Sequence, residues 1–161
     1  IINNTFGGTG VTLANNATAA TLTLTAGKVT TGANSMVVTG TAGLVTGGSS
    51  NYVNGTLIRS VAAGASVVAF PIGDAGNYTP LSLNFASATA GNVTVSTSVP
   101  NAPATSGNPP SGSGLSQTKY INRNWAVTSA ITATYAATFT YKDPADITGG
   151  ANTGALLVAF G

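Results

Sequence analysis

The chain has 161 residues, of which only eight are charged: five are Lys or Arg, three are Asp, and the net charge is +2. A typical soluble domain of this length carries roughly 40 charged residues. Glu, His and Cys are absent, so the chain lacks imidazole bases, thiol nucleophiles and the soft ligands of a metal cage. This composition excludes most enzyme chemistry, and we predict no catalytic residue, no metal site and no cofactor.

The same composition limits the partners that the chain can bind. Scattered cations release few counterions from a phosphate backbone, so we predict no nucleic-acid binding. No apolar run approaches the roughly 20 residues that a membrane-spanning helix needs, so we predict no membrane insertion. The five cations are Lys28, Arg59, Lys119, Arg123 and Lys142.

The N-terminal third consists of short apolar runs separated by Gly, Asn and Thr, at residues 11–13, 22–24, 36–38 and 44–45. This texture is typical of the winding of a β-solenoid or of a loosely built sheet. No repeat of fixed period accompanies it, although repeat architectures normally show one. We therefore expect one domain whose N-terminal third has only short apolar runs. Two subdomains are the alternative.

From Tyr52 onward the runs lengthen and alternate between apolar and small polar residues, which is the pattern of half-buried strands. Asn54-Gly55, between two apolar runs, predicts a two-residue hairpin. Later strands are predicted at residues 81–85, 93–99, 121–127 and 131–141.

These elements together predict an all-β fold for the whole chain, residues 1–161, as a single β domain. The expected architecture is an antiparallel β-sandwich, jelly-roll-like, with a solenoid-like N-terminal third. Residues 101–114 are rich in Pro, Gly and Ser and predict a loop.

The three Asp residues allow few reactive arrangements. Asp143 and Asp146 lie on either side of Pro144, and Asp74 follows a Gly. A glycosidase pair or a weakly bound ion could be built from them, but capping of turns is the commoner use of Asp at such positions. We interpret all three as turn residues.

Four aromatic residues are candidates for a carbohydrate-binding platform, because exposed rings pack on sugar faces: Tyr52, Tyr78, Tyr120 and Trp125. The alternative is that aromatic residues, Trp125 among them, supply bulk to a core otherwise made of Ala and Val, since the chain contains 26 Ala. Tyr135 shares one predicted strand face with Ile131 and Phe139, which favours the core.

Three segments carry a resemblance to known proteins: residues 52–59 (YVNGTLIR), 70–81 (FPIGDAGNYTPL) and 120–127 (YINRNWAV). They resemble the β-rich modules of secreted surface proteins and large adhesins of Bacteroidota, many of which are exported by the type IX secretion route. The likeness covers residues 20–130. It implies an extracellular, non-catalytic β protein at the cell surface.

A chain with so few charges also lacks the usual protection against sheet extension, because charged side chains normally keep edge strands from pairing with other molecules. Such a chain suits a structural subunit of an extracellular filament or surface layer, a homopolymer in which copies join by β-strand addition. The alternative function is an adhesive or carbohydrate-binding module of a larger surface protein, with glycans or surfaces as partners.

The donor strand of such a polymer is predicted at the N-terminus, where residues 1–10 form the exchanged segment. Residues 154–160 are the competing donor, although their uninterrupted apolar character suits a central core strand better. The predicted interface residues of the N-terminal donor are Ile1, Ile2, Thr5 and Phe6.

Overall fold

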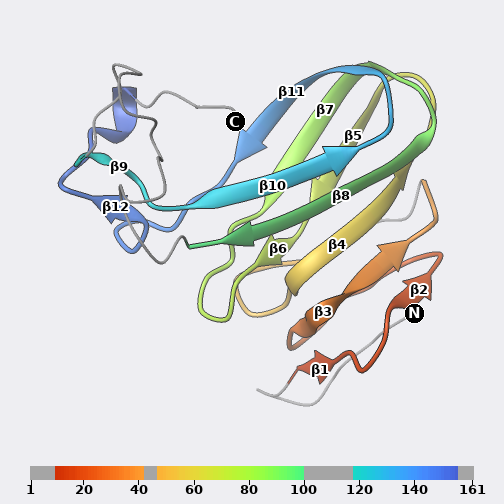
Figure 1. The fold of residues 1–161 in the computed structure, drawn as a ribbon, viewed down its shortest axis with the longest axis horizontal. Coiled ribbons are helices and arrows are strands. Elements are labelled where there is room, and N and C mark those ends of the chain that lie inside the picture. Colours follow the sequence, from red (N-terminus) through yellow and green to blue (C-terminus); the bar gives the residue numbers. More distant parts are fainter. Residues whose placement is uncertain (1–9, 42–46, 100–117, 156–161) are drawn as a thin grey trace.

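A computed structural model describes residues 10–41, 47–99 and 118–155 of the chain (Figure 1). These residues form β-strands and one short 3-10 turn, so the all-β prediction is confirmed. The predicted donor residues and the predicted loop at 101–114 lie outside the described residues. The elements are β1 (Val11–Thr12), β2 (Ala17–Ala19), β3 (Val29–Val38), β4 (Val53–Val61), β5 (Ser66–Phe70), β6 (Ile72–Gly73), β7 (Leu81–Ala88), β8 (Gly91–Ser98), β9 (Tyr120–Ile121), β10 (Asn124–Ser129), β11 (Ala133–Phe139), β12 (Ile147–Thr148) and η1 (Thr153–Ala155).

The N-terminal region is a β-solenoid of about 3 turns, as the texture of the sequence predicted. Its strands pair in parallel: β1 and β2 with β3, β3 with β4, and β4 with β6. One ladder of aligned residues joins Val11, Val29, Val53 and Ile72, which are 18, 24 and 19 residues apart in the chain. These unequal intervals explain why the sequence shows no fixed period.

The predicted hairpin at Asn54-Gly55 is wrong, because β4 runs straight through both residues. Gly55 has a φ of 125°, and a Cβ atom there would lie 2.0 Å from the Oγ1 of buried Thr31. That hydroxyl accepts a 3.0 Å hydrogen bond from the backbone N of Thr56. The glycine is therefore needed where neighbouring turns of the coil approach each other, not for a reversal of the chain.

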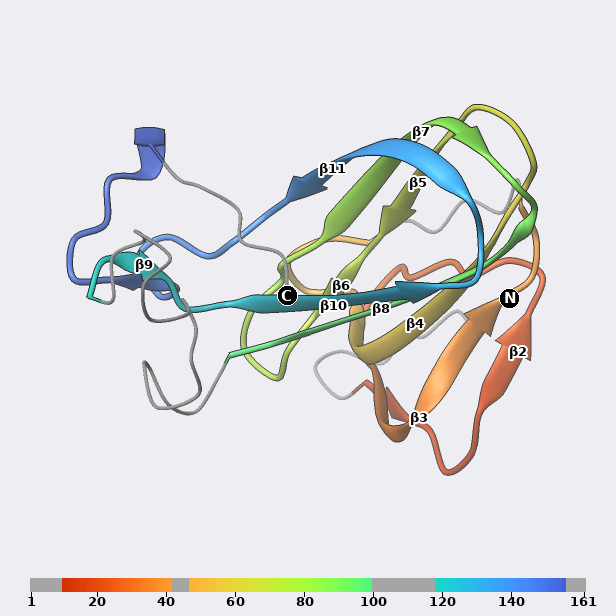
Figure 2. The same ribbon diagram turned by 45° about the horizontal axis from the view of Figure 1, so that its top comes forward.

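The coil continues into a sandwich (Figures 1 and 2). Strand β4 also pairs antiparallel with β8, and β8 pairs antiparallel with β10, which extends the same sheet to seven strands. A second sheet, β11-β7-β5, is antiparallel and forms the opposite layer. The larger sheet is therefore mixed, and the predicted antiparallel pairing holds only for its sandwich half.

One core fills the space between the two layers and extends into the coil. The predicted alternation is confirmed in β7, where Leu81, Leu83 and Phe85 are buried, and in β8, where Val93 and Val95 are buried. Inward side chains of β4 belong to the same core, because this strand serves both the coil and the sandwich.

The predicted strand over residues 121–127 is interrupted. β9 ends at Ile121 and pairs with β12 in a separate two-stranded sheet, and β10 begins only at Asn124. The predicted strand at 131–141 is shorter than expected, from Ala133 to Phe139, but its core-facing side is the expected one, because Ile131, Ala133, Ala137 and Phe139 pack against the core. Tyr135 shares this side and its ring lies 5.7 Å from that of buried Phe85, yet it is 51% exposed, although the sequence favoured a place for it in the core.

Candidate functional site

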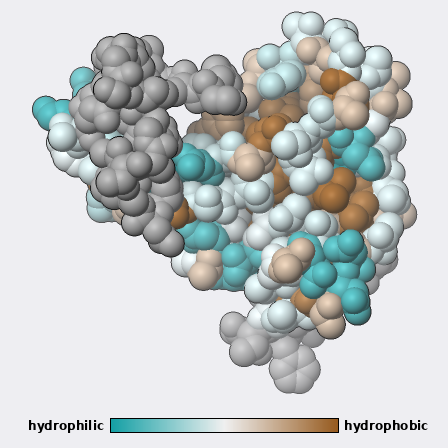
Figure 3. Space-filling model, in the orientation of Figure 1, coloured by the Kyte–Doolittle hydropathy of each residue, from teal (hydrophilic) through white to brown (hydrophobic). Residues whose placement is uncertain are grey.

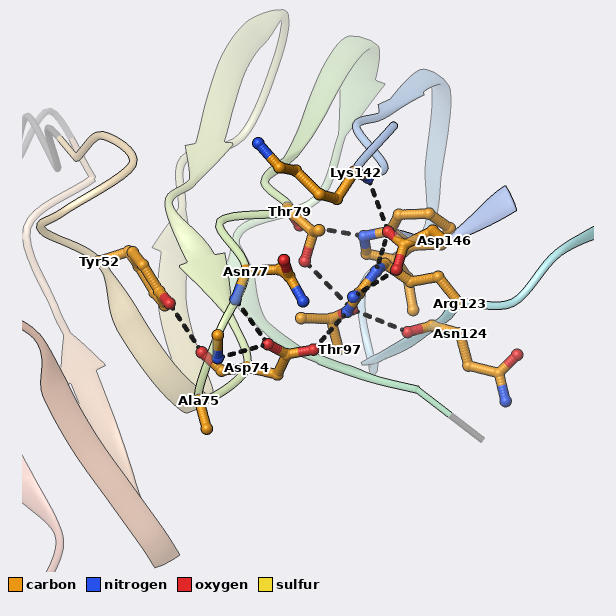
Figure 4. Close-up of polar contacts among 12 residues, drawn as sticks. Tyr52, Asp74, Ala75, Asn77, Thr79, Thr97, Arg123, Asn124, Lys142 and Asp146 are labelled. Atoms are coloured by element: carbon orange, nitrogen blue, oxygen red, sulfur yellow. Dashed lines mark hydrogen bonds and ion pairs between the residues drawn. The ribbon is translucent and has the colours of Figure 1, made fainter. Parts of the chain in front are cut away.

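The most deeply buried charges of the described chain meet at Arg123, between β9 and β10 (Figure 4). Its Nε and Nη2 donate hydrogen bonds of 2.6 and 2.7 Å to the two carboxylate oxygens of Asp146. Its Nη1 donates a 3.0 Å bond to Oδ2 of Asp74. Two parallel bonds to one carboxylate are the strong, directional form of an ion pair. One guanidinium thus joins loops that lie far apart in the sequence.

Asp74 caps a turn as well as pairing with Arg123. Its Oδ1 accepts hydrogen bonds from the backbone N of Gly76 at 2.9 Å and of Asn77 at 2.7 Å. Burial alone would raise the pKa of the Asp74 carboxyl, but the bonds from Gly76, Asn77 and Arg123 outweigh burial and lower the pKa below its usual value. Asp74 therefore caps the turn that Gly73-Asp74 predicted, and its carboxylate stays charged at neutral pH.

Asp146 has a different role from the one that the sequence suggested. It is 1% exposed, and besides Arg123 it accepts a 2.7 Å hydrogen bond from the backbone N of Lys142. Burial lowers the pKa of Arg123, but the bonds and charges of Asp146 and Asp74 outweigh burial and raise it. Asp143 is exposed. Two of the three carboxylates are therefore held in a structural ion-pair network.

The three sequence segments that carry the resemblance meet around this network. The hydroxyl of Tyr52 donates a 2.8 Å hydrogen bond to the backbone O of Asp74. The indole Nε1 of Trp125 donates a 3.1 Å bond to the backbone O of Thr79. Since Arg123 and Trp125 belong to the third segment, the three segments together join the coil, the 73–79 turn and β10.

The four predicted carbohydrate-binding residues do not lie on one surface. Tyr52 is fully buried, and its ring lies 5.6 Å from that of Tyr78, which is half-buried. Trp125 is half-buried against Phe139 at a ring distance of 5.1 Å, and Tyr120 is half-buried in β9. Burial removes Tyr52 from any surface that could touch a ligand.

A second feature is a cleft between the two sheets of the sandwich. It has a volume of about 260 Å³ and lies between β10 and β11, with Leu83 and Phe85 of β7 among its lining residues. Val127 and Ser129 line it from β10, and Tyr135 lines it from β11. Hydrophobic side chains are visible between the positions of these two strands in the space-filling view (Figure 3). The cleft therefore reaches the margin of the core: Leu83 and Phe85 stay buried at its base, whereas Val127 and Tyr135 are exposed at its walls.

The ends of this cleft are fixed. At one end the backbone N of Thr89 donates a 2.9 Å hydrogen bond to the O of Thr132, and Thr132 N donates a 3.0 Å bond to the Thr89 hydroxyl. At the other end the ring contact of Trp125 with Phe139 joins the two sheets. Contacts between the two sheets therefore define both ends of the opening between β10 and β11.

Both strands that border the cleft are edge strands in the part of the chain that is described. β10 pairs there only with β8, and β11 pairs only with β7. Strands β5, β7, β8, β10 and β11 contain no charged residue. The common charged protection of a sheet edge is therefore missing.

Two more cations donate hydrogen bonds to backbone carbonyl oxygens, Arg59 from a buried position and Lys28 nearer the surface. Besides the Arg123 network, Arg59 is 5% exposed and its Nη1 donates a 2.8 Å bond to the O of Ala69. The Nζ of Lys28 donates a 2.7 Å bond to the O of Ala75 and lies 4.8 Å from the ring centre of Tyr52. Three of the five cations, Arg123, Arg59 and Lys28, thus make contacts within the fold.

Among the described residues no three His, Cys, Asp or Glu side chains converge to hold a metal ion. No helix in the same ranges is long and apolar enough to cross a bilayer. No protein-family model, curated protein or solved structure matches this chain.

Proposed function

We propose that this chain is a structural subunit of an extracellular filament or surface layer, in which copies join by β-strand addition. The observation that supports this most directly is the cleft, lined mostly by hydrophobic residues, between β10 and β11, two adjacent, uncharged strands that are edge strands of the described chain. The extracellular setting follows from the resemblance of the 52–59, 70–81 and 120–127 segments to Bacteroidota surface modules.

In this proposal the acceptor is the cleft, and the occupant is a terminal segment of a second copy. An added strand gains main-chain hydrogen bonds from an edge strand and places alternate side chains in the groove. Val127 and Ser129 are two residues apart on β10, and Ala133 and Tyr135 are two apart on β11, so each wall offers side chains at strand spacing. The occupant therefore needs apolar side chains on the side that faces the groove.

We assign the occupant to the N-terminal segment. In an extended strand Ile2 and Phe6 would share one side, with Asn4 between them, and the other side would be mostly polar. In the competing segment, 154–160, apolar residues occupy both sides. The sandwich half would then be a jelly-roll-like polymerising unit, and the coil would extend its larger sheet.

The test is a charge placed in the cleft. Val127→Lys introduces an ammonium group on β10 at a position that is 36% exposed, so a monomer tolerates it, whereas an added strand would bury it. We expect negative-stain microscopy and sedimentation velocity to show polymers of the unaltered chain and monomers of Val127→Lys, with the same circular dichroism.

Val67→Lys is the matched control. Val67 lies on β5, at the opposite edge of the second sheet, and is 69% exposed. This variant should polymerise like the unaltered chain. Polymers of undiminished length from Val127→Lys, or a loss of polymers from Val67→Lys alone, would show that assembly does not use the cleft. An unaltered chain that stays monomeric at every concentration would overturn the proposed function itself.

A further inference from the structure

A second cleft, distinct from the one between β10 and β11, lies where the 73–78 turn meets the chain after β11. It has a volume of about 280 Å³, just below the range of about 300 to 1,000 Å³ that is usual for ligand pockets. Its lining combines two phenol rings with short polar side chains and one cation. The lining residues that matter here are Ser49, Asn77, Tyr78, Thr140, Tyr141 and Lys142.

We propose that this second cleft, the tyrosine cleft, binds a neutral saccharide. Tyr78 and Tyr141 each offer an apolar ring face together with a hydroxyl, which suits a ligand with apolar C–H faces and hydroxyl groups. The Asn77 amide and the Thr140 hydroxyl both donate and accept hydrogen bonds. This inference concerns a ligand and does not depend on whether the chain polymerises.

The charge at the cleft favours a neutral ligand over an anion. Among the described residues that line it, Lys142 is the only charged one, and the next residue, Asp143, carries an exposed carboxylate. A nucleic acid or another polyanion would require several convergent cations. A single ammonium group instead acts as one more donor to a sugar hydroxyl.

The walls of the tyrosine cleft are held in place by the buried network. Asp74 accepts the backbone hydrogen bonds that shape the turn before Tyr78. Asp146 accepts the backbone N–H of Lys142, on the opposite wall. Because Arg123 binds both carboxylates, one buried guanidinium fixes two loops that are far apart in the sequence. Such preorganisation lowers the entropic cost of binding a ligand between them.

Tyr78 is positioned by the same arrangement. Its ring lies against that of Tyr52, which is buried and hydrogen-bonded to Asp74. Burial raises the pKa of Tyr78, so its hydroxyl stays neutral and can donate as well as accept. The 73–79 turn therefore presents a fixed ring, and the ion-pair network supports a binding surface as well as the fold.

The experiment titrates the full chain carrying Val127→Lys, the variant expected to be monomeric, with four neutral tetrasaccharides, cellotetraose, maltotetraose, mannotetraose and tetra-N-acetylchitotetraose, and follows backbone amide resonances. We expect at least one of them to shift the amides of Gly76, Asn77 and Lys142. Val127 lines the other cleft, so these shifts decide the proposal without any change to the tyrosine cleft. No shift with any of the four, or shifts centred on β10 and β11, would overturn it.

Two variants sharpen the assignment. Tyr141→Ala should weaken binding of the responding saccharide about tenfold, the loss of about 1.4 kcal/mol that one ring contact supplies. Tyr135→Ala is the matched control, because Tyr135 is an exposed tyrosine that lines the other cleft. Equal affinities of the two variants would contradict the proposed site. If Tyr141→Ala does not fold, Lys142→Met, whose backbone bond to Asp146 is retained, should still weaken binding.

Discussion

Arg123 and Asp146 are 23 residues apart in the sequence and form a buried pair joined by two hydrogen bonds of 2.6 and 2.7 Å. The Arg123 side chain is 0% exposed, and that of Asp146 is 1% exposed. Burying two charges costs free energy, which is recovered only when the geometry is good and the remaining polar atoms are satisfied. Here Asp74 accepts a further hydrogen bond from Arg123, and the backbone N of Lys142 donates one to Asp146.

The first prediction is that Asp146→Asn strongly destabilises the fold. Removing one partner of a buried pair leaves an uncompensated charge and costs about 3 to 5 kcal/mol, a large part of the 5 to 15 kcal/mol, roughly, that holds a domain folded. Urea unfolding measures this loss. Asp143→Asn is the control, because this carboxylate is exposed on the same loop, and its change should stay within about 0.5 kcal/mol. Similar losses in the two variants would show that the pair is not a stabilising element.

The second prediction concerns acid. Since the folded state lowers the pKa of Asp74, this carboxylate stabilises the fold above the ordinary Asp pKa of about 3.9. The contribution is lost as the pH falls through the lower pKa of the folded state, where both states become protonated. The free energies of unfolding of the unaltered chain and of Asp74→Asn should therefore differ by a constant amount from neutral pH down to about 5. The two free energies should converge below about pH 4.

Urea midpoints at several pH values measure this convergence. Arg123 and Asp146 are the same in both proteins, so the difference isolates the carboxylate of Asp74 and its bonds. A difference that stays the same at the lowest pH, or grows as acid is added, contradicts the assigned role.

The third prediction tests the contact between turns of the coil. Gly55 and Gly64 both have positive φ angles, 125° and 98°, so alanine at either position strains the backbone by about 1 to 2 kcal/mol. Only at Gly55 would the new Cβ atom collide with a neighbour, the Thr31 hydroxyl, whereas nothing lies within 4 Å at Gly64. Gly55→Ala should therefore lose about 1 to 3 kcal/mol more than Gly64→Ala. Equal thermal stability of the two variants would show that the turns of the coil do not meet there.

Alternating hydrophobicity predicted much of the sandwich. The buried residues of β7 and β8 follow the expected period of two, because each strand packs one face on the core and leaves the other to solvent. The short runs of the N-terminal third likewise indicated a coil. These features are local, so a single sequence contains them.

Features that depend on distant contacts were not predictable in the same way. Asn54-Gly55 carries a strong hairpin signal, but the glycine is required by Thr31 of the preceding turn. The Arg123 network joins residues 23 and 49 positions apart, and no spacing in the sequence marks such a pair. The 121–127 strand is interrupted at Arg123 itself, which lies between β9 and β10 and pairs with Asp146.

The proposed acceptor cleft was also not visible in the sequence. It forms because the chain crosses from β10 in one sheet to β11 in the other, so two edge strands lie together without pairing. The scarcity of charge did indicate unprotected edges, and the structure adds that several of the few charges are buried. Composition therefore predicted unprotected strand edges, whereas the position of the cleft depends on how the chain crosses between the two sheets.

The most direct test of strand addition is a cross-link between copies. The chain has no Cys, so Ile2→Cys in one copy and Ser129→Cys in another create a single heterologous pair, with Val67→Cys in place of Ser129→Cys as the control and Leu157→Cys as the alternative donor. Disulfide formation needs the two Cα atoms within about 7 Å. We predict that a terminal cysteine, at position 2 or 157, links to position 129 and not to position 67. Polymers in which neither terminal cysteine links to position 129 more than to position 67 would contradict strand addition at the cleft.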